Sequence, residues 1–331
     1  MKRRVSALLA QWYDRGHRDL PWRRTADPYP IWVSEIMLQQ TRAAAVVPYY
    51  ERFLDRFPTV DALARAAEAD VLALWSGLGY YSRARNLLAA GRQIAARGSF
   101  PRDYVELRQL PGIGDYTAAA VASIAFGEPR AVLDGNVLRV VARMENDPGD
   151  IGASATRDRF RAVAESWLDR RASGPFNQAL MELGATVCMP RRPLCPECPL
   201  RARCRALANG TVAQLPVKLG RIPPERIEAV LLLIRRDRRI LLRQRALSEP
   251  RMPGFWDLPS PEHLPAVRPG APAGQFRHTI THHRYIFTVS PAPAPARLPT
   301  AAPFRWLDPR DAATIPLSTT ARKALRLAGL L

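Results

Sequence analysis

Four cysteines near residue 200 are the residues whose spacing most clearly indicates chemistry. Cys188, Cys195, Cys198 and Cys204 have six, two and five residues between them, a pattern typical of ligands around one metal centre. Thiolates are soft ligands that suit both zinc and iron–sulfur clusters, so the spacing alone leaves both open. A disulfide framework is disfavoured, because neighbouring pairs at these spacings would close only one small loop.

Two isolated acidic residues could together cleave a glycosidic bond. Glu35 lies among apolar residues at what we expect to be the start of a helix, and burial there would raise its pKa toward that of a general acid. Asp134 precedes Gly135, and its small neighbours suit an exposed carboxylate that stabilises a sugar cation. Each residue also has an ordinary interpretation. Glu35 could occupy a first helical turn, and Asp134 could be a helix N-cap.

A glycine-rich turn could hold a phosphate. Residues 110–114 read Leu-Pro-Gly-Ile-Gly and separate two predicted helices, the second of which starts at Asp115. Gly112 and Gly114 let a ligand approach the backbone closely, and the N–H groups at the following helix start form an anion site. A turn of this kind between helices is also common without any ligand.

The elements that must position these residues change character along the chain. Through residue 205 the apolar residues recur at helical spacing, which predicts a nearly all-α region. Residues 230–234 and 240–242 then predict a β-hairpin, and further strands are expected at 285–289 and 304–307. Residues 209–224 have the composition of a linker, and residues 291–295 that of an extended loop.

Length and charge narrow the class of protein. The chain has 331 residues and a formal net charge of +19, which suits two or three domains and favours nucleic acid as a partner. An arginine-rich, alanine-rich composition could also reflect a coding bias. The longest apolar run, at residues 118–126, is about half of what a membrane helix needs. The weakly apolar stretch between the basic start and Gln11 is too short for a secretory signal. We therefore expect a soluble, unprocessed cytoplasmic protein, nucleoid-associated if bacterial.

Six further motifs occur in a fixed order with the cysteine loop. They are RDLPWR at 18–23, SEIMLQQT at 34–41, GLGYYSRARNL at 77–87, LPGIGDYTA at 110–118, LDGNV at 133–137 and FNQALMELGA at 176–185. With this order and the C-x6-C-x2-C-x5-C loop, the sequence resembles the MutY family of adenine DNA glycosylases, within the endonuclease III or helix-hairpin-helix superfamily. The resemblance covers nearly all of residues 5–205.

The resemblance implies an α+β multidomain fold. An all-α helix-hairpin-helix glycosylase core with a [4Fe-4S] cluster in the cysteine loop would be followed by a Nudix-like α/β domain. The implied division is 1–208 for the catalytic region (a six-helix barrel at about 22–132, and an iron–sulfur subdomain from 1–21 plus 133–208), 209–225 for a linker and 226–331 for a MutT-like domain that recognises 8-oxoguanine.

The resemblance also implies residue roles. Glu35 would protonate adenine at N7 and Asp134 would stabilise the sugar cation, with Tyr116 and Asn136 beside them. Residues expected to line the adenine pocket are Arg18, Leu20, Trp22, Arg23, Gln178 and Met181. Residues expected to contact the DNA or the lesion are Gln40, Thr41, Leu78, Tyr80, Gly112, Gly114, Thr281 and His282.

One position argues against strand cleavage. Bifunctional relatives carry a Schiff-base lysine where this chain has Tyr116, and its lysines are Lys2, Lys218 and Lys323, all outside the motifs. Together with this position, the resemblance implies a monofunctional glycosylase that acts on adenine opposite 8-oxoguanine or guanine in double-stranded DNA. We further expect a monomer.

The C-terminal region resembles the family more loosely. Its acidic residues are scattered, so no Mg²⁺-dependent Nudix activity is expected. Ile280-Thr281-His282 stands where the family usually has Phe-Ser-His, which keeps a hydroxyl and an imidazole but no aromatic ring. His278, His282 and His283 could alternatively bind a metal. Two other functions also stay open: a non-catalytic iron–sulfur DNA-binding or redox protein, and a glycosylase of the same fold that prefers thymine or uracil mismatches.

Overall fold

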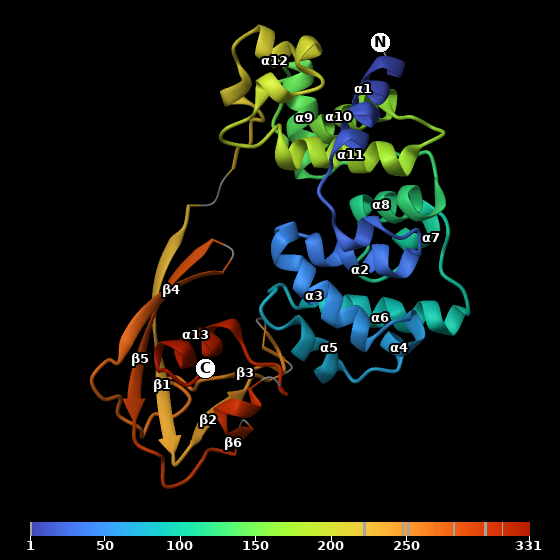
Figure 1. Ribbon diagram of the computed structural model, residues 1–331. Helices are drawn as coiled ribbons and strands as arrows, with labels where there is room; N and C mark the ends of the chain where they lie inside the picture. The colour runs from blue at the N-terminus through green and yellow to red at the C-terminus, as the bar shows by residue number, and fades with distance from the viewer. Residues whose placement is uncertain are drawn as a thin grey trace. The chain divides into compact units, whose positions relative to one another are not determined.

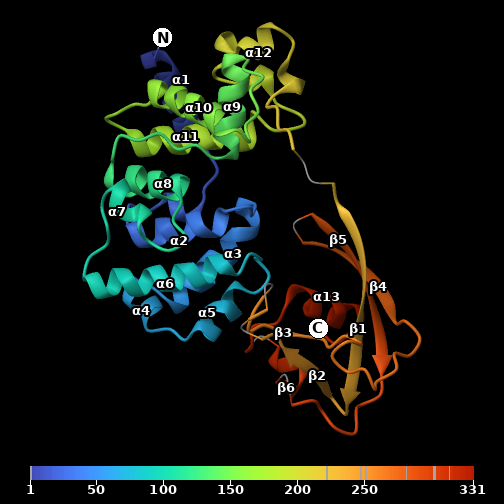
Figure 2. The same ribbon diagram turned by 180° about the vertical axis from the view of Figure 1, so that it is seen from behind.

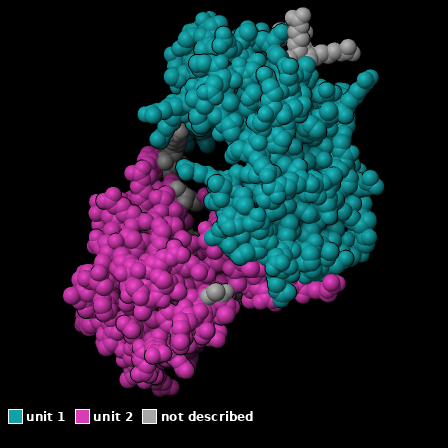
Figure 3. Space-filling view, in the orientation of Figure 1, with its two compact units in different colours: residues 1–64, 89–221 teal, residues 65–88, 222–331 magenta. Residues whose placement is uncertain are grey.

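The computed structural model describes residues 2–220, 223–246, 248–249, 252–280, 282–300, 303–312 and 314–331, with backbone alone for residues 2–4. The chain divides into two compact units (Figure 3). Residues 1–64 and 89–221 form the first unit, and residues 65–88 and 222–331 form the second.

Helices build the first unit, which confirms the predicted all-α region (Figure 1). Their bounds are α1 Lys2–Arg15, α2 Pro28–Leu38, α3 Ala43–Arg56, α4 Val60–Ala64, α7 Tyr104–Arg108, α8 Asp115–Phe126, α9 Gly135–Glu145, α10 Ser154–Trp167, α11 Ser173–Thr186 and α12 Arg205–Ala208. Helix α6 (Ser82–Arg97) runs from the second unit into the first.

Helix α8 packs closely because its buried face is made of small side chains. Ala118, Ala119 and Ala120 are all buried, and α8 contacts both α2 and α11. The helix starts after Gly114 and ends at Gly127, whose φ of 72° is a left-handed C-cap that glycine adopts without strain. Because α8 packs closely on α2, side chains from the two helices can contact one another.

A cluster of buried apolar residues joins α1 to α8, α9, α10 and α11. Leu9, Phe160 and Leu180 are buried in it, and three of the four cysteines pack at its edge. Part of the predicted linker is also fixed to this unit, since Ile151 N donates to Val217 O at 3.0 Å. Residues 221 and 222 of that linker lie outside the described residues.

The second unit contains a mixed six-stranded sheet. Its strands are β1 Glu225–Arg236, β2 Arg239–Gln244, β3 Trp256–Asp257, β4 Gly274–Ile280, β5 His283–Ala292 and β6 Phe304–Leu307. Their order is β3-β2-β1-β5-β4, and β6 pairs with β2. The predicted hairpin and both further predicted strands are confirmed. Strand β5 runs on through Pro291 to Ala292, so the predicted loop begins later than expected.

Strands β1 and β5 pair in parallel over their whole common length, from Glu225 beside His283 to Ile234 beside Ala292. Helix α13 (Thr319–Leu327) covers one face of the sheet, and both views show it there (Figures 1 and 2). Residues of the α5 segment (Glu68–Trp75) and the loop after it belong to this unit too, where the Tyr81 ring lies 4.0 Å from that of Phe255. Among the described residues, no helix has the length and apolar character that crossing a membrane requires.

Candidate active site

Glu35 and Tyr116 meet inside the first unit. Glu35 on α2 is only 4% exposed, and the Tyr116 hydroxyl on α8 donates a 2.6 Å hydrogen bond to its Oε2. The same hydroxyl lies 3.2 Å from the sulfur of Met181 on α11. Three helices therefore hold one carboxyl group in a fixed and largely dry position.

The expectation that Glu35 lies at a helix entry is wrong. Helix α2 begins at Pro28, with Asp27 as the N-cap that accepts a hydrogen bond from Tyr29 N. Glu35 is thus near the C-terminal end, where the helix dipole does not favour a negative charge. The first-turn interpretation of Glu35 is excluded with it.

Burial changes the acidity of Glu35. Desolvation is the main cause that raises its pKa to about 7, and the charge of Asp134 acts in the same direction. The Tyr116 hydrogen bond and the Arg23 charge partly oppose this rise. A carboxyl group with this pKa still carries a proton for a large part of the time at neutral pH, which a general acid requires.

Asp134 is bound differently. It is the N-cap of α9: Oδ1 accepts a 2.7 Å hydrogen bond from Val137 N, and Oδ2 accepts one of 2.8 Å from Asn136 Nδ2. The N-cap interpretation is therefore confirmed. Burial raises the pKa of Asp134, but these bonds favour its ionised form and oppose the rise. Glu35 and Asp134 thus form a pair in which one carboxyl is better suited to hold a proton and the other a charge.

One cavity of about 1150 Å³ brings the predicted residues together within the first unit. Its lining includes all four predicted catalytic residues and all six residues predicted for the adenine pocket. They come from the turn before α2, from α2, α8 and α11, and from the start of α9. Sequence positions more than a hundred residues apart converge on this cavity.

Glu182 is a residue of the cavity that the sequence analysis missed. Arg18 donates to both of its carboxylate oxygens, at 2.8 and 2.6 Å, and Arg23 donates to Oε2 at 2.7 Å. Burial alone would raise the pKa of Glu182, but the two arginines outweigh it and bring the pKa to about 2. The signal was a lone acid within the apolar motif FNQALMELGA, comparable to Glu35 in its own motif.

Tyr13 on α1 was also missed. Its hydroxyl lies 3.2 Å from Gln178 Oε1, in a geometry in which the tyrosine donates. Its ring stacks on His17 with the centroids 4.0 Å apart, and the Arg23 guanidinium lies 5.5 Å from the ring centroid. Tyr13 therefore orients the side chain of one predicted pocket residue and supports another.

The residues predicted to contact DNA fall into three groups. Gln40 and Thr41 line the cavity, and Gln40 is exposed with a φ of 58°. Gly112, with a φ of 76°, lies in the turn before α8, and Gly114 is the α8 N-cap.

The third group belongs to the second unit. Leu78 is buried there, whereas Tyr80 is 47% exposed and has a φ of 48°. His282 is partly buried in the turn between β4 and β5. Thr281 lies outside the described residues.

The four cysteines face one pocket at the edge of the helical core, next to α9 and α12. None of the four forms a disulfide bond. Burial is the main cause that raises the pKa of Cys198 to about 11, and the neighbouring cysteines add to the rise. Four sulfur atoms that line one pocket are a donor set suited to a metal centre.

Two arginines of α9 hold the cysteine loop. Arg143 is 1% exposed and donates to the carbonyl oxygens of Met189, at 2.9 Å, and Pro190, at 3.2 Å. Arg139 donates to Cys188 O at 2.7 Å and to Asn136 Oδ1 at 2.8 Å. One side chain therefore links the cysteine loop to the residue that hydrogen-bonds Asp134.

The chain is similar to known base excision repair proteins. Residues 33–166 match the family model described as HhH-GPD superfamily base excision DNA repair protein. Adenine DNA glycosylase of Homo sapiens is 44% identical over 228 residues, which cover 63% of this chain and 42% of the relative. That of Mycobacterium tuberculosis (strain CDC 1551 / Oshkosh) is 47% identical over 197 residues, covering 58% and 64%. The chain thus spans less than half the length of the human relative.

Solved structures share the helical fold. A thermostable thymine-DNA glycosylase superposes with a TM-score of 0.56 at 29% identity, covering 63% of this chain and 97% of that one. An endonuclease III in a non-covalent DNA complex superposes with a TM-score of 0.53 at 22% identity, covering 63% and 98%. The expected resemblance to adenine DNA glycosylases of the helix-hairpin-helix superfamily is confirmed.

Proposed function

We propose that this chain, whose helical region is similar to the helix-hairpin-helix base excision repair proteins, is a monofunctional adenine DNA glycosylase. It hydrolyses the N-glycosidic bond of adenine opposite 8-oxoguanine or guanine in double-stranded DNA. The observation that carries the proposal is the convergence of Glu35, with a pKa of about 7, and Asp134 on one cavity. An acid and a carboxylate in one site are what cleavage of a glycosidic bond requires.

The reaction divides between the two carboxyl groups. Glu35 gives its proton to N7 of the flipped adenine, so the electron pair of the breaking bond leaves on a neutral base. The sugar then carries the positive charge, and Asp134 faces that charge while keeping its bonds to Val137 and Asn136. Water attacks the sugar and releases a proton, which completes hydrolysis.

The pocket that holds the base is built from the rest of the cavity. Trp22 and Leu20 supply buried apolar surface, while Arg18 and Arg23 supply donors fixed by Glu182. A base can enter only after it leaves the duplex stack, at a cost of a few kcal/mol. The exposed Gln40 and Tyr80 side chains suit the contacts that offset this cost.

The cysteine loop suits a [4Fe-4S] cluster. Cys188, Cys195, Cys198 and Cys204 would hold it, and its bound form would supply four metal–sulfur bonds that fix the loop. Arg139 and Arg143 connect this loop to α9, and so to the Asp134 end of the same helix.

Other features of the chain support DNA as its binding partner. The turn with Gly112 and Gly114 ends at the N-terminus of α8, where backbone N–H groups suit a phosphate. For the sheet unit we infer a Nudix-like fold that recognises 8-oxoguanine through His282 and Thr281, without Mg²⁺-dependent hydrolysis. The first unit contains the whole cavity, so a monomer suffices for catalysis.

A single-turnover excision panel tests the proposal. Duplexes with A:8-oxoguanine, A:G, T:G and a uracil mismatch are incubated with excess protein, treated with alkali and resolved by length. We expect cleavage at adenine opposite 8-oxoguanine and guanine. The similarity to a thymine-DNA glycosylase makes thymine the alternative base, and preferential cleavage at T:G would establish it. Binding without excision of any base would instead indicate a non-catalytic DNA-binding protein.

A further inference from the structure

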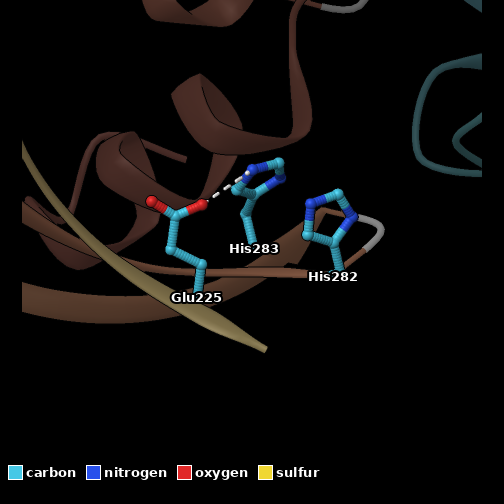
Figure 4. A group of neighbouring side chains, drawn as sticks. All are labelled: Glu225, His282 and His283. Carbon is cyan, nitrogen blue, oxygen red and sulfur yellow. Dashed lines mark ion pairs between the residues drawn. The ribbon is translucent and has the colours of Figure 1, made fainter. Parts of the chain in front are cut away.

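Three potential metal ligands meet at one end of the sheet in the second unit. They are Glu225, the first residue of β1, His282 in the turn after β4, and His283, the first residue of β5 (Figure 4). One ligand atom from each lies within 4.8 Å of the others. His278, expected from the sequence as a third histidine, is not part of this group; its Nδ1 lies 3.4 Å from Lys323 Nζ.

The strand pairing explains why these three side chains meet. Glu225 and His283 are direct partners in the parallel β1–β5 ladder, so their side chains point to the same face. Arg226 and Arg284, the next pair, point to the opposite face by the alternation of the strands. The backbone also fixes His282, since Glu225 N donates to His282 O at 3.0 Å. Backbone bonds thus hold the three ligand positions in place.

The distances suit a shared cation. His283 Nε2 lies 3.2 Å from Glu225 Oε2. Two ligands about 2.1 Å from one metal in tetrahedral geometry are about 3.4 Å apart. The His282 and His283 rings, with centroids 3.9 Å apart, lie on the same side as the carboxylate (Figure 4).

The donor set defines the class of ion. Two imidazole nitrogens and one carboxylate oxygen suit a borderline transition metal such as Zn²⁺ or Co²⁺ far better than Mg²⁺ or Ca²⁺. Glu225 has an exposed fraction of 64%, so water can complete the coordination. We propose that Glu225, His282 and His283 form a site for one divalent transition-metal ion, separate from the cysteine loop of the first unit. This inference does not depend on the proposed DNA substrate, and one ring nitrogen of His282 on the ion leaves its other N–H for the lesion contact proposed above.

Cobalt absorption distinguishes this site from the cysteines. Co²⁺ alone is titrated into the whole 331-residue chain, and the visible d–d bands are recorded together with the near-ultraviolet region. We expect this site to give d–d bands without a thiolate-to-cobalt charge-transfer band, because the proposed ligands are nitrogen and oxygen; cobalt bound at the four cysteines would add that band. Zn²⁺ should displace the cobalt and remove the bands.

Variants assign the bands to residues. Glu225→Gln keeps the shape of an exposed side chain, so it should preserve the fold while weakening Co²⁺ binding by more than about tenfold, as should His282→Ala and His283→Ala. His278→Ala, in the same sheet, is the matched control and should bind as the unchanged protein does. Bands that survive His282→Ala/His283→Ala, an equal loss in His278→Ala, or cobalt bound only through thiolates would overturn the assignment. So would the absence of any cobalt bands, which would leave Glu225 and His283 as a simple ion pair.

Discussion

The hydroxyl of Tyr116 donates to Oε2 of Glu35 at 2.6 Å, although the two residues are 81 positions apart. This contact opposes the effect of burial on the Glu35 pKa. The acidity of the carboxyl group is therefore set by a balance between a dry environment, which favours the protonated form, and a hydrogen bond that favours the charged form. Both sides of the balance can be changed by substitution.

Glu35→Gln should abolish excision while leaving DNA binding intact. Glutamine keeps the size and the acceptor oxygen of the side chain but cannot give up a proton, so the loss should be about 10²- to 10⁴-fold. Single-turnover excision and an equilibrium binding titration on the same A:8-oxoguanine duplex measure the two effects. Equal losses in both would show that Glu35 has a structural role instead.

The same variant predicts a pH-dependent change in stability. The pKa of Glu35 is about 7 in the folded chain against an ordinary 4.5, so folding favours the protonated form. The contribution of Glu35 to the free energy of unfolding is therefore fully present below about pH 4.5 and is lost as pH rises through 7. Glu35→Gln should therefore raise the free energy of unfolding at pH 8 relative to the unchanged protein, by at most about 3 kcal/mol.

Denaturant unfolding at pH 4.5 and pH 8 measures that difference. The gain from Glu35→Gln should shrink at pH 4.5, because Glu35 of the unchanged protein is then protonated in the folded state and about half protonated in the unfolded state. Asp14→Asn is the control, because it removes an acid on the exposed side of α1. Gln39→Glu would not serve, because it adds a new acid to the cavity wall. A gain of the same size at both pH values would contradict a raised pKa for Glu35.

Tyr116→Phe should move the pH dependence of excision. Below the Glu35 pKa the acid is protonated and active, and above it the rate should fall about tenfold per pH unit. Removing the hydroxyl removes a bond that lowers the pKa, so the fall should begin at a higher pH. A single-turnover pH profile from pH 6 to pH 9.5 measures this shift of the excision rate.

Tyr104→Phe is the control variant for Tyr116→Phe, because it also removes one tyrosine hydroxyl. Its hydroxyl donates to the exposed Asp115, so the pH profile should keep its position. If Tyr116→Phe lowers the rate equally at every pH, the hydroxyl positions the base rather than setting the acidity of Glu35.

Particular residues show how far the sequence could predict this protein. The four cysteines, Glu35 and Asp134 could be picked out from motifs, because the residue types and spacing within a motif can be read from the sequence alone. The Glu182 contact with Arg18 could not be predicted, since the two residues are 164 positions apart and pair only once α11 packs beside the N-terminal segment. The start of α2 was misplaced because Asp27 and Pro28, its N-cap and first residue, precede the motif that drew attention to Glu35.

The strand pairing of the sheet could also be predicted only in part. The hairpin of β1 and β2 is a local feature, and its alternating pattern was sufficient to predict it. The parallel pairing of Glu225 with His283 joins segments far apart in the chain. No local pattern specifies such a partner, and so the carboxylate beside the two histidines escaped the sequence analysis.

Glu182→Gln should weaken excision by loosening two arginines. The carboxylate accepts from both Arg18 and Arg23, and a neutral amide holds them less strongly, by about 1–3 kcal/mol, or roughly 10- to 100-fold in rate. Because the pKa of Glu182 is about 2, this carboxylate stays ionised throughout the assay range, and the loss should not vary with pH. Glu128→Gln, an acid of the same unit outside the cavity, is the matched control. A loss confined to one end of the pH range would contradict this role.

Lys218 provides the last test, because it lines the cavity although it lies outside every motif. An amine in this position could attack the sugar and cut the strand, and only a desolvated or cation-flanked lysine is activated for that step. Lys218 is exposed, so we expect excision without incision before alkali, and no covalent adduct when borohydride is present. If an adduct forms and Lys218→Ala removes it while excision continues, the chain is bifunctional and the prediction from Tyr116 is wrong.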